Sequence, residues 1–162
     1  MRIPVTCLAI LIALSASALA APAPVAPVIK PHFVSQREGL AYMREGPSYD
    51  HKILWAYRHR GYPFLVTAGF DVWRRVVAAD GTTGWMSANM LSDQRTVLVT
   101  GKGRAQIRQS ESGGKVVGLA DPGAVASLKT CTLQACHIHG EDIDGWIARD
   151  RIWGVSTDEV FK

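Results

Sequence analysis

The sequence places four residues that can bind metals or carry redox chemistry close together: Cys131, Cys136, His137 and His139. Thiolates and imidazoles are the usual ligands of zinc. In an extended strand, however, the two histidines share one face and Cys136 points to the other, so the four side chains converge poorly on one ion. In an oxidising compartment this spacing favours a Cys131–Cys136 disulfide, and we predict no metal site and no cofactor. Metal or redox handling is the least favoured alternative.

Catalytic signatures are missing from the sequence. It contains no Gly-x-Ser-x-Gly nucleophile elbow, no His-Glu-x-x-His zinc motif and no cysteine placed with His and Asp in a peptidase-like context. We therefore predict no catalytic residues and a protein that is not an enzyme.

Aromatic and basic residues crowd one stretch of the first half of the chain, and they are the candidate ligand-binding residues. They are Tyr42, Tyr49, Trp55, Tyr57, Arg58, Arg60 and Tyr62. Exposed rings beside guanidinium groups suit an extended peptide that bears carboxylates, because rings give contact area at low entropic cost and arginine pairs with carboxylates. We expect Tyr42 and Tyr49 on the surface. Each of the five tryptophans has two equally favoured interpretations. Its ring either packs inside or between the domains, or it belongs to the exposed binding surface.

The elements that must position these residues are strands. Short runs of β-forming residues alternate with turns rich in Gly, Pro, Asp and Ser, and no long window has the period of an amphipathic helix, so the chain is predicted to be all-β. The predicted strands are residues 41–44, 53–57, 64–68, 73–77 and 83–86 in the first half, and 95–99, 105–108, 116–120, 124–128, 136–139 and 144–148 in the second.

The second half of the chain repeats the first. Ala41-Tyr42-Met43-Arg44 is matched by Ala105-Gln106-Ile107-Arg108, and Thr83-Gly84-Trp85-Met86 by Asp144-Gly145-Trp146-Ile147. The period is roughly sixty residues, which predicts two small domains in tandem. We place them at residues 33–92 and 93–156.

The first of these domains carries a set of motifs in a fixed order. Arg-Glu-Gly-Pro-Ser at 44–48, Trp-Arg-Arg-Val at 73–76 and Gly-Trp-Met at 84–86 are followed by Leu91. In this order and spacing they resemble the bacterial SH3-like domain, a small β-barrel of exported and cell-wall-associated bacterial proteins. The resemblance implies a binding function, with the peptide part of peptidoglycan as the usual ligand. We expect Gly84 to let two strands pass closely and the ring of Trp85 to fill the centre of the barrel.

The second domain departs from this pattern and is predicted to be a diverged SH3-like barrel. Its first turn lacks the Gly-Pro pair, and Ala135-Cys136-His137-Ile138 stands where the first copy has Trp73-Arg74-Arg75-Val76. Loss of the tryptophan removes core volume. We expect the disulfide to compensate for that loss.

The N-terminal residues predict export. Arg2, an uncharged apolar stretch from Val5 to Leu14 and a small-residue site ending at Ala20 form the layout of a signal peptide over residues 1–20, with a retained anchor helix as the less favoured interpretation. After cleavage no transmembrane segment is expected, and the protein is periplasmic or secreted. Residues 21–32 are rich in proline and alanine and predict an extended linker. The formal net charge of +4 is too small for nucleic-acid binding.

Together these features predict a non-catalytic binding module of the cell envelope that recognises peptidoglycan peptide or another envelope peptide. The alternative is a protein–protein adaptor or structural subunit of a periplasmic complex. A large exposed apolar patch across both domains would favour that alternative.

Overall fold

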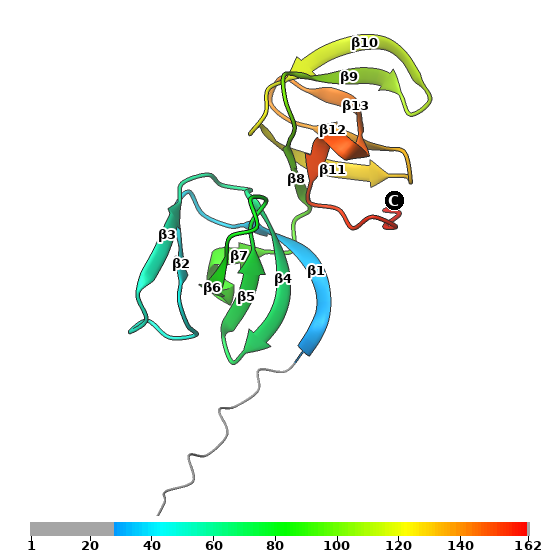
Figure 1. Ribbon diagram of the computed structural model, residues 1–162. Coiled ribbons are helices and arrows are strands. Elements are labelled where there is room, and N and C mark those ends of the chain that lie inside the picture. The colour runs from blue at the N-terminus through cyan, green and yellow to red at the C-terminus, as the bar shows by residue number, and fades with distance from the viewer. Residues whose placement is uncertain (1–27, 162) are drawn as a thin grey trace, which may run out of the picture.

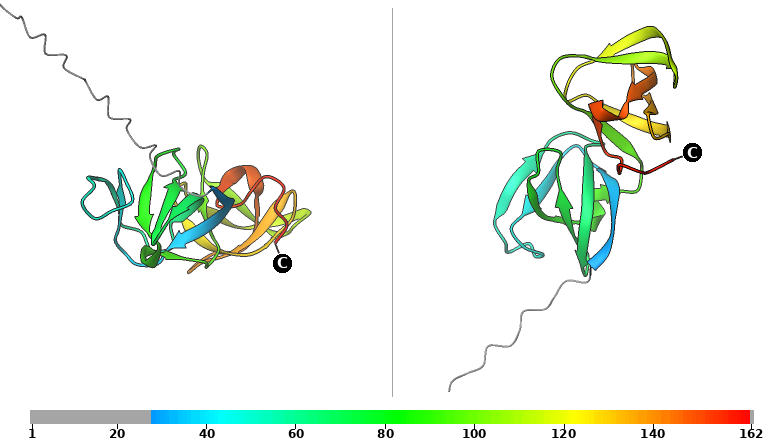
Figure 2. Two further views of the ribbon diagram at one scale, coloured as in Figure 1. Left: turned by 90° about the horizontal axis from the view of Figure 1, so that it is seen from below. Right: turned by 45° about the vertical axis from the view of Figure 1, so that its right-hand side comes forward.

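The computed structural model describes residues 28–161, which form two β-sheet units joined end to end (Figures 1 and 2). These residues contain fourteen strands and two short 3-10 helices, and no α-helix. The all-β fold class is therefore confirmed. The predicted signal peptide and residues 21–27 of the predicted linker lie outside the described residues. Over residues 28–161, no helix has the length and apolarity needed to cross a membrane.

The first unit is one antiparallel sheet with the strand order β3-β2-β6-β5-β4-β1-β7. Its long first strand pairs on one side with β4 and on the other with β7, and this pairing curls the sheet into a barrel (Figure 1). The elements are β1 (Val28–Gln36), β2 (Ala41–Arg44), β3 (Ile53–Tyr57), β4 (Pro63–Phe70), β5 (Trp73–Val77), β6 (Thr83–Ser87), η1 (Ala88–Met90) and β7 (Leu91–Ser92).

The second unit repeats this arrangement strand for strand, with the order β10-β9-β13-β12-β11-β8-β14. Its first strand, β8, pairs with β11 and β14, as β1 pairs with β4 and β7. The elements are β8 (Thr96–Val99), β9 (Ala105–Ser110), β10 (Gly113–Ala120), β11 (Val125–Cys131), β12 (Ala135–His139), β13 (Asp144–Ala148), η2 (Arg149–Arg151) and β14 (Ile152–Trp153). The chain thus forms two small antiparallel β-sheet units that share one strand order.

Strand β1 begins inside the segment predicted as a linker, so residues 28–32 belong to the sheet instead. Pro31 hides this strand in the sequence, because proline cannot donate to a sheet ladder. The register between β1 and β4 shifts across this proline, from Val28 opposite Ala68 to His32 opposite Val66. Beyond the shift, residues 33–36 are buried. Burial of this second part of the strand holds it in the sheet despite the proline.

The centre of the first barrel is filled by medium-sized side chains, and the prediction for Trp85 is wrong. Successive residues of β6 face opposite sides of the sheet, so Gly84 and Met86 are buried and Trp85, between them, is only half-buried on the outer face. A Cβ atom on Gly84 would lie 2.4 Å from Cγ of Met43. The barrel is too narrow there for a methyl group, and far too narrow for an indole.

The same close approach recurs in the second barrel at Gly145. A Cβ atom there would lie 2.7 Å from the carbonyl oxygen of Arg108 and 2.7 Å from Cγ2 of Ile107. In the first barrel, Gly84 faces Met43 and the carbonyl oxygen of Arg44. The repeat predicted from the sequence pairs these same positions. The structure therefore places the repeated residues in equivalent contacts.

The predicted disulfide between Cys131 and Cys136 is present. The two cysteines lie directly opposite each other on β11 and β12, and both are fully buried in the core of the second barrel. Ala135 begins β12, as Trp73 begins β5. Closing so short a loop stabilises a fold by about 2 kcal/mol in the chain-entropy model. The disulfide is therefore well placed to compensate for the smaller side chain.

The two barrels contact each other beside the short connection between β7 and β8. Thr96 Oγ1 donates a hydrogen bond of 2.6 Å to the carbonyl oxygen of Gly61 in the first barrel. The rings of Phe33 and Trp153 meet edge to face, 5.3 Å apart, and the guanidinium of Arg95 lies 6.0 Å from the Phe33 centroid. Trp153 thus packs between the two barrels. Packing, as opposed to exposure on a binding surface, was one of the two interpretations for the tryptophans.

Replacing Gly84 with alanine tests the narrow interior. We expect Gly84→Ala to lower the free energy of unfolding by roughly 1–3 kcal/mol, because the new methyl group collides with Met43 and with backbone. Gly39→Ala is the matched control, since a Cβ atom there has no neighbour within 4 Å. Urea unfolding followed by tryptophan fluorescence measures both. Equal stability of the two variants would contradict the packing described.

Candidate functional site

The structure separates the predicted binding residues into groups instead of gathering them in one groove. Tyr42 and Tyr49 are exposed, as predicted, at 42% and 64% of their surface, and they share one pocket. Trp55 is 58% exposed on β3 and does not line that pocket. The other members are the half-buried Tyr57 and Tyr62 and the exposed Arg58 and Arg60.

The pocket beside Tyr42 and Tyr49 is formed on the outer face of the first barrel. Along β2, Ala41 and Met43 point into the core, so Tyr42 and Arg44 point outward. The cavity has a volume of about 50 Å³. Its lining residues, which we call the aromatic pocket, are Tyr42, Arg44, Tyr49, Trp73, Ser87 and Met90.

Arg44 fixes the shape of the aromatic pocket. Its Nη1 donates hydrogen bonds to the carbonyl oxygens of Tyr49 and His51, at 2.9 and 2.8 Å, and these bonds hold the β2–β3 turn against the barrel. The guanidinium lies 5.5 Å from the centroid of the Tyr49 ring, a cation–π geometry. Tyr49 in turn meets Trp73 edge to face at 4.9 Å. One cation therefore positions an exposed ring over a buried one.

The equivalent surface of the second barrel keeps the arginine and loses the rings. Arg108 Nη1 donates to the carbonyl oxygen of Gly114 at 3.0 Å, as Arg44 does to its own turn. Gln106 takes the repeat position of Tyr42, and the cavity beside it contains one aromatic residue, Trp146. The aromatic pocket is therefore a property of the first barrel.

Tyr57 and Tyr62 belong to a packed aromatic cluster with Phe64. The three ring centroids lie 4.9 to 5.2 Å apart. Burial raises the pKa of the Tyr57 hydroxyl far above its ordinary value, and the nearby Asp80 carboxylate raises it further. Burial also raises the pKa of Tyr62. These two rings pack at the edge of the barrel core, away from the aromatic pocket.

Trp55 lies on a strand edge with other exposed apolar residues. Its neighbours on β3, Ile53 and Leu54, are also exposed. Strand β10 takes the same place at the end of the second sheet and exposes Val116, Val117 and Leu119. Each barrel thus presents an apolar edge strand, and the two edges belong to separate barrels (Figure 1).

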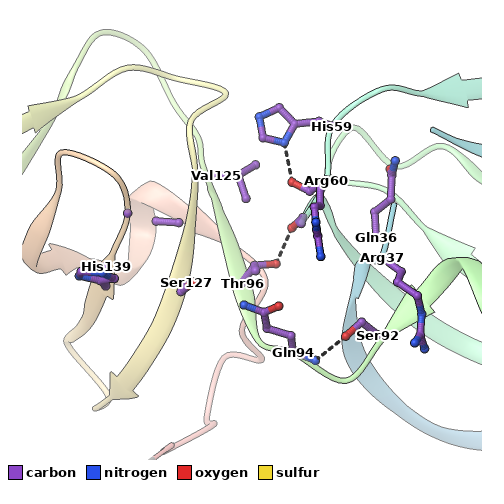
Figure 3. Close-up of a pocket in the computed structure, with 13 residues that line it drawn as sticks. Gln36, Arg37, His59, Arg60, Ser92, Gln94, Thr96, Val125, Ser127 and His139 are labelled. Atoms are coloured by element: carbon purple, nitrogen blue, oxygen red, sulfur yellow. Dashed lines mark hydrogen bonds between the residues drawn. The ribbon is translucent and has the colours of Figure 1, made fainter. Parts of the chain in front are cut away.

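Two basic residues after β3, His59 and Arg60, line a cleft between the two barrels, whereas Arg58 does not (Figure 3). This inter-barrel cleft has a volume of about 270 Å³. The first barrel lines it with Arg37, His59 and Arg60, and the second with Val125, Ser127 and His139. Arg60 was a predicted binding residue, but the cleft itself was not foreseen, because its walls come from segments far apart in the chain.

The histidines next to the disulfide are held by one carboxylate. Asp144 accepts hydrogen bonds from His139 Nδ1 at 2.9 Å and from His137 Nε2 at 2.8 Å, and these bonds lower the pKa of Asp144. The ring of Trp146 stacks on His137 at 5.4 Å. Among residues 28–161 no three His, Cys, Asp or Glu side chains are arranged to hold a metal ion. With both cysteines in the disulfide, the thiols that the metal hypothesis needs are not free.

Residues 37–93 match the Bacterial SH3 domain family. The matched segment runs from the residue after β1 to the residue after β7, and so covers most of the first barrel. The aromatic pocket lies wholly within this matched segment. Membership of the second barrel in the same family remains a proposal that rests on its equal strand order and equivalent glycine contacts.

Other comparisons add little to the SH3 domain match. No curated protein matches the chain. Two solved structures, NlpC1 and NlpC2 from Trichomonas vaginalis, are similar over 76% of this chain, with 12% and 10% sequence identity and TM-scores of 0.35 and 0.36. The chain covers 45% and 48% of those two proteins, less than half of each. These scores are too low to indicate a shared activity.

The raised pKa of the half-buried Tyr57 predicts a dependence of stability on alkaline pH. An unfolded tyrosine ionises near pH 10. Because the folded protein holds this proton to higher pH, unfolding releases it, and stability falls as the pH rises above about 10. We expect Tyr57→Phe to weaken this fall, measured as the change in urea midpoint between pH 9 and 11. An unchanged pH dependence in Tyr57→Phe would contradict the assigned burial.

Proposed function

We propose that the protein is a non-catalytic binding module of the bacterial cell envelope, periplasmic or secreted, whose first barrel binds the peptide part of peptidoglycan or another envelope peptide. The match of residues 37–93 to the bacterial SH3 domain supports this proposal, since members of that family are often cell-wall-binding modules. The observation that carries it is the aromatic pocket. It joins exposed rings, a fixed cation and a small cavity on that matched domain.

The dimensions of the aromatic pocket suit a peptide of small residues. A cavity of about 50 Å³ exceeds the roughly 10–15 Å³ that a site needs to hold one water molecule, so it has room for a small group such as a methyl. The rings of Tyr42 and Tyr49 both line the cavity and provide flat contact area for such a group. Arg44 adds a positive charge near the backbone, where a peptide carboxylate would lie.

The disulfide supports a location outside the cytoplasm. Structural disulfides persist in oxidising compartments and are rare where glutathione keeps thiols reduced. Cys131 and Cys136 are fully buried in the second barrel, so their bond is part of the fold. The SH3 domain match agrees with an extracytoplasmic protein. Export through the predicted signal peptide is part of this proposal.

One observation favours the alternative function as a protein–protein adaptor. The edge strands β3 and β10 expose apolar residues in equivalent places on the two barrels. An edge strand also offers backbone groups to an added strand, which is a common way to bind a protein partner. The two apolar edges are separate, whereas the adaptor hypothesis expected one patch across both domains. We therefore rank it second.

Retention on purified insoluble peptidoglycan tests the proposed function. We expect the wild-type protein to sediment with the wall material and a Tyr42→Ala/Tyr49→Ala variant to remain in the supernatant. Both rings are exposed, so the variant should fold, and its thermal unfolding checks this. Trp55→Ala is the matched control, because it removes an equally exposed ring outside the pocket.

Three results would count against this proposal. Equal loss of retention in Trp55→Ala would place binding on the β3 edge. Full retention of the double variant would show that the aromatic pocket is not the binding site. If the wild type is not retained at low salt, wall binding is wrong, and the adaptor hypothesis takes its place.

A further inference from the structure

The inter-barrel cleft is lined by basic side chains and by no carboxylate. Arg37, His59, Arg60 and His139 all line it, and none of its lining residues within the described chain is Asp or Glu. The remaining polar lining consists of neutral groups such as Gln94 and Ser127. Such a concentration of one sign of charge in a concave site attracts counter-ions of the opposite sign.

Both barrels are needed to form this cleft. Arg37 follows β1, and His59 and Arg60 lie in the connection from β3 to β4, all in the first barrel. His139 ends β12 of the second barrel. The hydrogen bond from Thr96 to the carbonyl oxygen of Gly61 joins the two walls. In Figure 3, Arg60 points into the space between the barrels, and Val125 and His139 lie on the opposite wall.

Within residues 28–161, the two arginines of the cleft form no ion pair. Arg37 donates from Nε and Nη2 to the carbonyl oxygen of Leu91, at 3.0 and 2.6 Å, so a neutral group holds its guanidinium in place. Arg60 is exposed, and its guanidinium makes no hydrogen bond or ion pair with any residue from 28 to 161. The four ion pairs in that part of the chain involve neither arginine.

Two histidines line the cleft, one from each barrel, and their Nδ1 atoms are engaged within the protein. His59 Nδ1 lies 2.8 Å from the carbonyl oxygen of Arg60, so this nitrogen carries the proton. His139 is held on the other wall by its hydrogen bond to Asp144. That carboxylate is shared with His137. It does not line the cleft.

We propose that the inter-barrel cleft binds an oxyanion, the carboxylate or phosphate group of a ligand, with Arg60 as its principal partner and Arg37 behind it. Guanidinium groups suit this role because their planar set of donors matches the oxygens of carboxylate and phosphate. A volume of about 270 Å³ accommodates the charged group together with the part of the ligand that carries it. This site goes beyond the proposed function, since the aromatic pocket lies elsewhere on the first barrel.

Titration of the full protein, followed by backbone amide NMR signals, tests this site. The probes are N-acetyl-alanyl-alanine, its C-terminal amide and inorganic phosphate, each at low salt. We expect the carboxylate, the phosphate or both to shift the signals of Gly61, Ser127 and Gly140, and the amide to leave them unchanged. Whichever anion binds more tightly identifies the source of the oxyanion. Shifts caused equally by the amide, or no shifts at these residues with either anion, would overturn the proposal.

Two variants make the test specific. Arg60→Gln should weaken anion binding roughly tenfold or more, as expected for loss of a hydrogen bond between charged groups. Arg75→Gln is the control, because Arg75 is an exposed arginine of the same barrel that does not line the cleft. Equal weakening by both variants would show a general charge effect and overturn the proposal. The Tyr42→Ala/Tyr49→Ala variant should bind anions as the wild type does, so failure of wall binding and failure of the cleft are distinguishable.

Discussion

The width of each barrel is the constraint on which the rest of the structure depends. Gly84 and Gly145 lie so close to the facing strands, β2 and β9, that neither position has room for a methyl group. The largest fully buried side chains are correspondingly modest, with Phe64 and Met43 first among them. The first barrel has more aromatic residues than this interior holds, and Tyr42, Tyr49 and Trp55 are exposed. The remaining rings must lie on the outside, at the barrel edges or between the barrels.

This displacement of aromatic rings explains where binding surfaces arise. Trp73 is buried to 5% exposure at the start of β5 and serves as the base on which Tyr49 rests. Trp153 packs between the barrels, against Phe33. The second barrel has fewer rings and contains a disulfide in its core. Both barrels have an arginine at the repeated position, Arg44 and Arg108. Within the described residues, only the first barrel has several rings beside that arginine, and there they form the aromatic pocket.

Many of the strands could be predicted, because the alternation of apolar and polar residues and the positions of turn residues agree with the strands of the fold. The strands at 41–44, 53–57, 73–77 and 144–148 have the bounds expected from alternation and turn residues. Three strands, β1, β7 and β14, were not predicted. Pro31 masks β1, and the other two contain two residues each, too few for a periodic pattern.

The sites were less predictable than the strands, for a physical reason. Exposure of Tyr42 and Tyr49 follows from alternation along β2 and from the turn that follows it. The inter-barrel cleft, in contrast, joins Arg37, Arg60 and His139, which come together only when the two barrels pack. For Trp85, residue type alone gave the wrong location. A large apolar ring was expected inside the barrel, but the alternation of side chains along β6 places it on the outer face.

The solvent accessibility of each tryptophan tests the narrow-barrel account most directly. The protein would be labelled with 5-fluorotryptophan, its five fluorine signals assigned with single Trp→Phe variants, and each signal followed while a soluble paramagnetic agent is added. The account predicts that Trp73 is the most protected of the five and that Trp55 is broadened first, with Trp85 between them. Protection of Trp85 as strong as that of Trp73 would place its ring inside the barrel and contradict the account.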